Sequence, residues 1–221
     1  MYFNPARNNI LPLILLILIL LFGACSKHHE ALVVKNPPSS DRGYLVSYAK
    51  TGHMTAGEVL RDARDEGGVS TYARYDLDLY SIVYNSLDGG VPLEVSGLVF
   101  VPQNVNGPLD LLQNHHGTII PGDEQETPST YTGGKRGSSE MYFVGATMAS
   151  NGYVVSMPDY VGYVVTVDQD LPYTLHHELA EVSVDMLRDT RQLMQTLSVN
   201  ISNEVFLTGW SEGGGAGLAT H

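Results

Sequence analysis

Apolar and polar residues alternate in a way that predicts strands in the first half of the chain. Residues 75–80 follow this two-residue period, and residues 93–101 form a second apolar run that ends at Pro102. The turn sequence Asp88-Gly89-Gly90 lies between them, so the two segments are expected to pair as an antiparallel hairpin. A short helix is expected before the hairpin, over residues 55–64.

Beyond the hairpin, short apolar strands alternate with helices. Strands are predicted at three places, residues 109–113, 153–157 and 205–207. A helix is expected at residues 141–150, and apolar residues from Leu175 to Leu197 recur at spacings that place them on one face of a long helix. This alternation is typical of a parallel sheet with packed helices, so the predicted fold class is α/β. Residues 121–139 are polar and glycine-rich, which predicts a long surface loop.

The first 25 residues have the pattern of an export signal. Arg7 precedes an almost wholly apolar run over residues 10–22, which is short for a membrane span, and small residues follow it. The end of this segment, Leu21-Phe22-Gly23-Ala24-Cys25, resembles the bacterial lipobox, although Phe22 stands where that pattern usually has Leu. We therefore expect lipidation at Cys25 and an exported protein that is lipid-anchored to a bacterial membrane in the cell envelope. Plain secretion and an uncleaved anchor are the alternatives.

Composition indicates one folded domain after a polar tether. The tether is expected over residues 26–45 and the domain over residues 46–221. A hydrophobic content of 43% and a charged content of 16% are typical of globular proteins. The net charge of −12 argues against a nucleic-acid partner, and Cys25 is the only cysteine, so the mature domain has no disulfide. The oligomeric state is left open.

The most informative motif is Gly209-Trp210-Ser211-Glu212-Gly213. It matches the G-x-S-x-G nucleophile elbow, because an apolar strand precedes it and a glycine-rich helix start follows. Such a turn holds Ser211 in a strained backbone conformation, and side chains at Gly209 or Gly213 would collide with the neighbouring strand and helix. We predict that Ser211 is the nucleophile of an acyl transfer, and an ordinary turn serine is the alternative.

A serine nucleophile also needs hydrogen-bond donors for the oxyanion that forms on the substrate. The backbone amide of Glu212 is predicted as one donor, because it follows the nucleophile. The segment His116-Gly117-Thr118 follows a predicted strand and resembles the H-G-x oxyanion loops of lipases and esterases. A second backbone donor is therefore expected from Gly117 or Thr118, with a purely structural turn as the alternative. The side chain of Glu212 is expected at the surface or beside the site.

The paired histidines do not predict a metal site. His115 and His116 are adjacent in an extended segment, so their side chains point in opposite directions, and no third ligand stands at a useful spacing. His176 and His177 are interpreted as helix-start or surface residues, and His28-His29 as part of the tether. No metal and no cofactor are predicted.

Two residues that could be mistaken for triad members are given other roles. Asp159 precedes Ser211, whereas the expected order is serine, acid, histidine, so Asp159 is predicted to organise its loop, with a function at the edge of the site as the alternative. His221 is the only histidine after Ser211, but ten residues of helix span about 15 Å. We therefore do not assign His221 as the catalytic base.

From about Tyr72 to His221 the chain resembles the α/β-hydrolase superfamily, and its bacterial secretory lipases and esterases in particular. Five segments carry the resemblance in the family's order: residues 96–102 (SGLVFVP), 116–118 (HGT), 158–163 (PDYVGY), 185–188 (DMLR) and 209–214 (GWSEGG). The resemblance implies an N-terminal antiparallel hairpin, then a parallel sheet flanked by helices, and a serine hydrolase that cleaves lipid or acyl esters. Prolyl-oligopeptidase-like peptidases share several segments, so a peptide substrate is an alternative. A non-enzymatic envelope lipoprotein that reuses the fold is another.

The resemblance also implies residues that this sequence lacks. The family carries the triad acid and histidine on about three further strands after the elbow. We therefore expect that both residues lie outside this chain and that the C-terminal part of the fold is missing. The 221 residues alone are expected not to hydrolyse esters.

Overall fold

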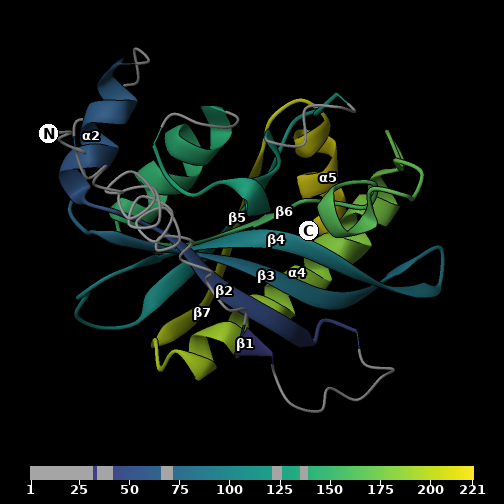
Figure 1. Cartoon of the computed structure of the whole chain (residues 1–221), viewed down its shortest axis with the longest axis horizontal. Coiled ribbons are helices and arrows are strands. Elements are labelled where there is room, and N and C mark those ends of the chain that lie inside the picture. The colour runs from purple at the N-terminus through teal and green to yellow at the C-terminus, as the bar shows by residue number, and fades with distance from the viewer. Residues whose placement is uncertain (1–31, 34–41, 66–71, 121–125, 135–138) are drawn as a thin grey trace, which may run out of the picture. The chain divides into compact units, whose positions relative to one another are not determined.

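The computed structural model describes residues 32–33, 42–65, 72–120, 126–134 and 139–221, and their centre is a seven-stranded sheet (Figure 1). The strands are β1 (Leu32–Val33), β2 (Leu45–Met54), β3 (Leu77–Asp88), β4 (Val91–Pro102), β5 (Leu109–His115), β6 (Tyr153–Pro158) and β7 (Ile201–Gly209). The helices are α2 (Ala56–Asp65), α3 (Thr147–Ser150), α4 (His176–Thr196) and α5 (Glu212–Thr220), with the π-helix η3 (Met141–Ala146) and the 3-10 turns η2 (Pro128–Thr130) and η4 (Val164–Thr166).

The sheet has an antiparallel and a parallel part, in the order β1-β2-β3-β4-β6-β5-β7. The predicted hairpin is confirmed as β3 and β4, which pair antiparallel from Leu77 opposite Pro102 to Asp88 opposite Val91. The predicted parallel part is also confirmed, because β5 runs parallel to both β6 and β7. Strand β6 joins the two parts by pairing antiparallel with β4.

Strand β2 was not expected from the sequence. Its residues do not alternate cleanly between apolar and polar, and only the two ends, Leu45 and Met54, are buried. The strand is positioned by its antiparallel pairing with β3. Leu32 and Val33, within the predicted tether, pair with β2 as the short strand β1.

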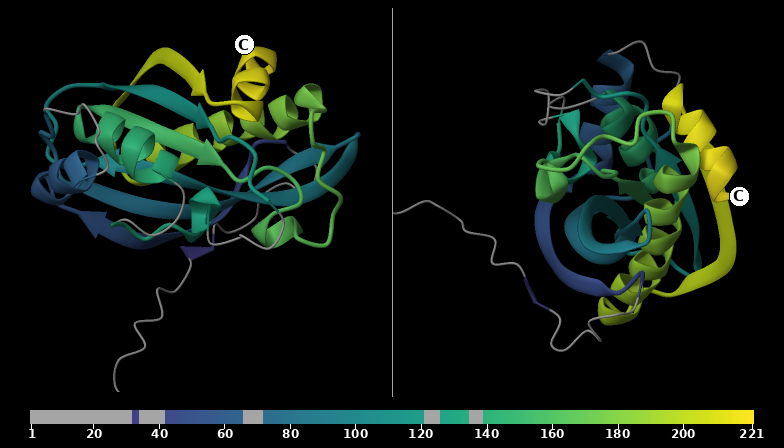
Figure 2. Two further views of the ribbon diagram at one scale, coloured as in Figure 1. Left: turned by 90° about the horizontal axis from the view of Figure 1, so that it is seen from above. Right: turned by 90° about the vertical axis from the view of Figure 1, so that its right-hand side faces the viewer.

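Helices cover both faces of the sheet (Figure 2). Strand β4 shows how the core is divided, since Val99 and Val101 face the cluster that contains residues of α4 and α5. Leu98 and Phe100 face the opposite cluster, which contains residues of α2, η3 and α3. The period of two along β4 therefore supplies apolar side chains to two separate cores.

Helix α4 is the long amphipathic helix predicted from apolar spacing, and it carries a buried carboxylate. Asp185 accepts hydrogen bonds from the Ser86 hydroxyl at 2.7 Å, Arg42 Nε at 3.0 Å and Arg188 at 2.7 Å. These charged partners offset the cost of burying Asp185. Through Asp185, the segment at residues 185–188 (DMLR) connects α4 to Ser86 of β3 and to Arg42, which precedes β2.

The remaining predicted segments have mixed outcomes. The helix expected over residues 141–150 is present as η3 followed by α3. Within the loop expected over residues 121–139, the described part contains the turn η2. Among the helices in the described ranges, none is long and apolar enough to span a bilayer. The predicted signal and Cys25 lie outside the described residues.

Candidate active site

Ser211 lies in a tight turn between β7 and α5. Its backbone has φ 54° and ψ −117°, a conformation that a residue other than glycine adopts only under strain. The amide of Gly213 donates to the carbonyl oxygen of Trp210 at 2.8 Å, and the amide of Gly214 donates to that of Ser211 at 3.0 Å. Helix α5 therefore begins directly after an exposed serine. This is the strand–turn–helix geometry of a nucleophile elbow.

Two glycines allow the turn to be this tight. A methyl group at Gly209 would lie 2.2 Å from the carbonyl oxygen of Gly213, and one at Gly213 would lie 1.9 Å from the carbonyl oxygen of His115. Both distances are far below van der Waals contact, so any side chain would push α5 away from β7 and β5. The elbow is therefore held by direct backbone contacts between two strands and a helix.

The loop after β5 runs beside this elbow. Strands β5 and β7 are parallel neighbours, and His115 and Gly209 are register partners at their carboxyl ends. A methyl group at Gly117 would lie only 2.9 Å from Cδ1 of Trp210. The sheet thus brings Gly117 and the elbow, which are far apart in sequence, to the same edge.

Glu140, which precedes η3, binds the β5 loop through both carboxylate oxygens. Oε1 accepts a hydrogen bond from the amide of Gly117 at 2.9 Å, and Oε2 accepts one from the side-chain amide of Asn114 at 3.2 Å. The amide of Gly117, a predicted oxyanion donor, is therefore committed to a carboxylate. Thr118 is then the candidate for the second donor, beside Glu212. Sequence reasoning missed Glu140 because it lies 23 positions from Gly117 and no pattern connects the two.

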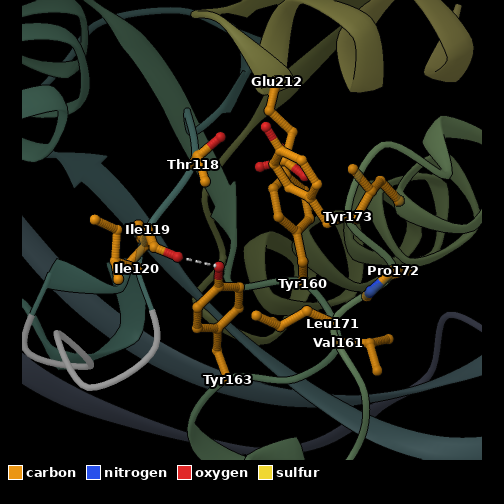
Figure 3. A pocket seen from close by; sticks show the side chains of 11 residues that line it. Thr118, Ile119, Ile120, Tyr160, Val161, Tyr163, Leu171, Pro172, Tyr173 and Glu212 are labelled. Atoms are coloured by element: carbon orange, nitrogen blue, oxygen red, sulfur yellow. Dashed lines mark hydrogen bonds between the residues drawn. The ribbon is translucent and has the colours of Figure 1, made fainter.

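An apolar pocket of about 250 Å³ opens beside the elbow (Figure 3). Its lining comes from the β5 loop, the segment after β6, and helices α4 and α5: Thr118, Ile119, Ile120, Tyr160, Val161, Tyr163, Leu171, Pro172, Tyr173, Leu179 and Glu212. Thr118 and Glu212, both predicted as sources of oxyanion donors, line the same pocket. A carbonyl group held between their amides would have an apolar space for its substituent.

Two tyrosines in the pocket wall are held in their uncharged form. The hydroxyl of Tyr163 donates to the carbonyl oxygen of Ile119 at 2.8 Å, which Figure 3 marks with a dashed line. Burial raises the pKa of Tyr163 to about 12 and the pKa of Tyr160 well above its usual value, and the carboxylate of Glu212 adds to both shifts. These phenols can therefore donate hydrogen bonds but cannot act as bases near neutral pH.

Asp159, directly after β6, joins three segments around the site. Its buried carboxylate accepts hydrogen bonds from the Ser96 hydroxyl at 2.5 Å, the Ser129 amide at 2.8 Å and the Ser129 hydroxyl. Its carbonyl oxygen lies 3.1 Å from Nε2 of His116. Burial raises the pKa of Asp159. These contacts agree with the predicted role of Asp159 in organising its loop.

The ring nitrogens of His115 and His116, at the end of β5, contact other protein groups and not the hydroxyl of Ser211. His115 Nδ1 lies 3.0 Å from the carbonyl oxygen of Thr208, and His115 Nε2 lies 3.1 Å from the hydroxyl of Thr220. His116 Nδ1 lies 2.7 Å from the carbonyl oxygen of Gly117. Across the described ranges, no group of three His, Cys, Asp or Glu side chains comes together to hold a metal ion.

Comparison with known proteins finds similarity in structure. No protein-family model and no curated protein sequence matches the chain. A presumed hydrolase from Legionella pneumophila matches with a TM-score of 0.68 and 29% identity, over 80% of this chain and 46% of that chain. The rice cell wall degrading esterase LipA from Xanthomonas oryzae matches with a TM-score of 0.67 and 23% identity, over 81% and 45%. Candida antarctica lipase A matches with a TM-score of 0.54 and 13% identity, over 86% and 40%.

The chain spans about half the length of these solved structures, or somewhat less. At 23% and 13% identity, the esterase and the lipase are evidence for a shared fold only. The chemistry of the site therefore has to be argued from the residues of this chain.

Proposed function

Because the chain has the α/β-hydrolase fold of lipases and esterases, we propose that it carries the nucleophile of a serine hydrolase that cleaves carboxylic esters. The observation that carries this proposal is the strained turn at Ser211, clamped between Gly209 and Gly213. Strain of this kind persists where the surrounding structure enforces it, and it is concentrated at functional sites. The apolar pocket beside the elbow favours an acyl group over a charged substrate.

In the proposed reaction, the Ser211 oxygen attacks the carbonyl carbon of a lipid or other acyl ester. The serine proton passes to a histidine, and the oxyanion accepts hydrogen bonds from the backbone amides of Glu212 and Thr118. The start of α5 adds the positive end of the helix dipole. The bond to the leaving alcohol then breaks as the alcohol takes the proton, and water hydrolyses the acyl-serine.

We propose that the triad histidine and acid lie outside residues 1–221. Among the described histidines, His115 and His116 have their ring nitrogens directed at other groups. His221 follows the nine-residue helix α5, at the opposite end from Ser211. Removing the base from a serine hydrolase costs several orders of magnitude in rate.

A fluorophosphonate probe and 4-nitrophenyl esters test the proposal. The 221-residue chain is compared with any longer product of the same reading frame. Labelling at Ser211 and turnover are expected from the longer product only, and Ser211→Ala should abolish both, with a loss of about 10⁶-fold in kcat. If the 221-residue chain itself hydrolyses esters and Ser211→Ala removes that activity, the assignment as an esterase stands. The proposal that the triad histidine and acid lie outside residues 1–221 would then be wrong. Cleavage of prolyl peptides instead of esters would assign a peptidase, and no labelling at all would favour a binding lipoprotein.

We further propose that Cys25 carries a lipid that anchors the protein to a bacterial envelope membrane. The support is the lipobox-like sequence before Cys25. Expression in bacteria fed with radioactive palmitate should label the wild-type protein, and Cys25→Ser should remove the label and release the protein from membranes. Labelling that persists in Cys25→Ser would contradict the anchor.

A further inference from the structure

The pocket beside the elbow is small and mostly apolar. Ile119, Leu171 and Leu179 contribute aliphatic side chains to it, and its volume is about 250 Å³. Pockets that hold drug-sized ligands typically measure about 300–1,000 Å³. This space is therefore suited to a short acyl chain or to one aromatic ring.

Glu212 brings a negative charge to the same pocket. Figure 3 shows its side chain extending from the start of α5 toward the rings of Tyr160 and Tyr173. Within the described part of the chain, no Lys, Arg or His forms an ion pair with Glu212. An unneutralised carboxylate beside an apolar space repels another anion more strongly than it would in open water.

The position of Glu212 makes this charge relevant to the substrate. Its backbone amide is the predicted donor to the oxyanion, and Ser211 precedes it directly. Thr118, the candidate for the second donor, lines the pocket on the β5 side. An ester carbonyl bound between the two amides would therefore place its acyl group close to the carboxylate of Glu212.

We infer that Glu212 determines substrate specificity: the pocket binds a short or aromatic uncharged acyl group, and the Glu212 carboxylate excludes acyl groups that end in an anion. This inference rests on the proposed function. It gives the backbone and the side chain of Glu212 separate tasks, because the amide contacts the carbonyl oxygen and the carboxylate selects the acyl group. Exclusion of the wrong ligand by charge is a common source of specificity.

Binding of benzamide and benzoate tests the inference without any turnover. The two molecules have nearly the same shape and differ in charge. Their affinities for the 221-residue chain can be measured by calorimetry and by fluorescence of Trp210, the only tryptophan. Benzamide is expected to bind at least about tenfold more tightly than benzoate, and Glu212→Gln is expected to remove most of that difference.

Glu204→Gln is the matched control. Glu204 is exposed on β7 and does not line the pocket, and its substitution changes the net charge of −12 by the same amount. This variant should keep the preference for benzamide. An equal effect of Glu204→Gln and Glu212→Gln would assign the preference to net charge and overturn the inference. A preference that survives in Glu212→Gln, or no binding of benzamide, would overturn it as well.

Kinetics of the active enzyme provide a second measurement. In the longer product of the reading frame, kcat/KM is expected to be much higher for 4-nitrophenyl butyrate than for 4-nitrophenyl hemisuccinate, and Glu212→Gln should raise the hemisuccinate value about tenfold. An unchanged ratio would count against the role of Glu212. The two proposals can fail separately. Ser211→Ala should keep the benzamide preference of the 221-residue chain, and absence of ester turnover in the longer product with that preference intact would reject only the proposed function.

Discussion

The elbow after β7 and the loop after β5 lie side by side at one edge of the sheet, yet they are held in different ways. The elbow depends on backbone contact, since Gly209 and Gly213 leave no room for a side chain. The β5 loop depends on side chains from elsewhere, because Glu140 binds Gly117 and Asn114. The turn at the predicted nucleophile therefore depends on glycines within the motif itself, whereas the position of the predicted oxyanion loop depends on the side chain of a residue outside that loop.

Gly213→Ala should disrupt the elbow and have the largest effect on stability. Its methyl group would lie 1.9 Å from the carbonyl oxygen of His115, so we expect a loss of more than about 4 kcal/mol in the free energy of unfolding. Gly214→Ala is the control, because a methyl group there has its nearest neighbour at 3.7 Å. That variant should be neutral or more stable by up to about 1 kcal/mol, since alanine favours helix. Urea unfolding of both variants measures the contrast, and equal losses would refute the backbone-contact explanation.

His115 connects the two regions and should make their contact sensitive to acid. Burial lowers the pKa of His115 from 6.5 to about 4. Between these values the unfolded chain binds a proton that the folded chain does not, so stability falls as the pH falls from 6.5 to 4. The expected loss from this residue is about 3 kcal/mol.

The measurement is the free energy of unfolding from pH 7 to pH 4 in the wild type and in His115→Gln. The variant should show a shallower dependence on pH across this window. Asp159, whose pKa is raised by burial, contributes a slope of opposite sign, but that slope is present in both proteins and cancels in the comparison. Identical slopes would mean that His115 is accessible to protons in the folded state.

Glu140→Ala should loosen the β5 loop while leaving the elbow intact. Loss of a charged acceptor for two hydrogen bonds is expected to cost about 2 kcal/mol of stability. If the proposed function holds, the longer product should lose about tenfold in kcat with little change in KM, because the loop is the predicted source of an oxyanion donor. Glu140→Gln, which keeps a neutral acceptor, should lose roughly half as much stability. An unaffected kcat in Glu140→Ala would show that the loop position does not depend on this carboxylate.

The smallest effect on stability is expected at Ser211 itself. Its φ of 54° is unfavourable for any residue with a Cβ, so Ser211→Gly should be more stable than Ser211→Ala by about 1 kcal/mol. In the longer product, both variants should lack the proposed ester hydrolysis. Thermal unfolding of the pair gives the difference directly, and a more stable alanine variant would show that the turn is unstrained.

The sequence could predict what depends on local pattern. The β3–β4 hairpin, helix α4 and the β7–α5 turn follow from alternation, helical spacing and paired glycines, and all three are present. Strand β2 could not be predicted, because its burial depends on pairing with β3 rather than on its own pattern. The hydrogen bond from Gly117 to Glu140 and the pocket wall could not be predicted either, since they require segments that no local pattern connects to meet in the fold.

The composition of α5 has a consequence for how the molecule moves. Four of its nine residues are glycine: Gly213, Gly214, Gly215 and Gly217. Each is less favourable than alanine in a helix interior by about 0.8–1.0 kcal/mol, so α5 has little tendency to be helical by itself. The helix is held in part by packing on α4: Gly215 lies against the ring of His176, and a methyl group at Gly215 would lie 2.3 Å from Nε2 of that ring. Backbone amides of α5 should therefore exchange with deuterium early, as local opening frees the helix before the rest of the domain unfolds.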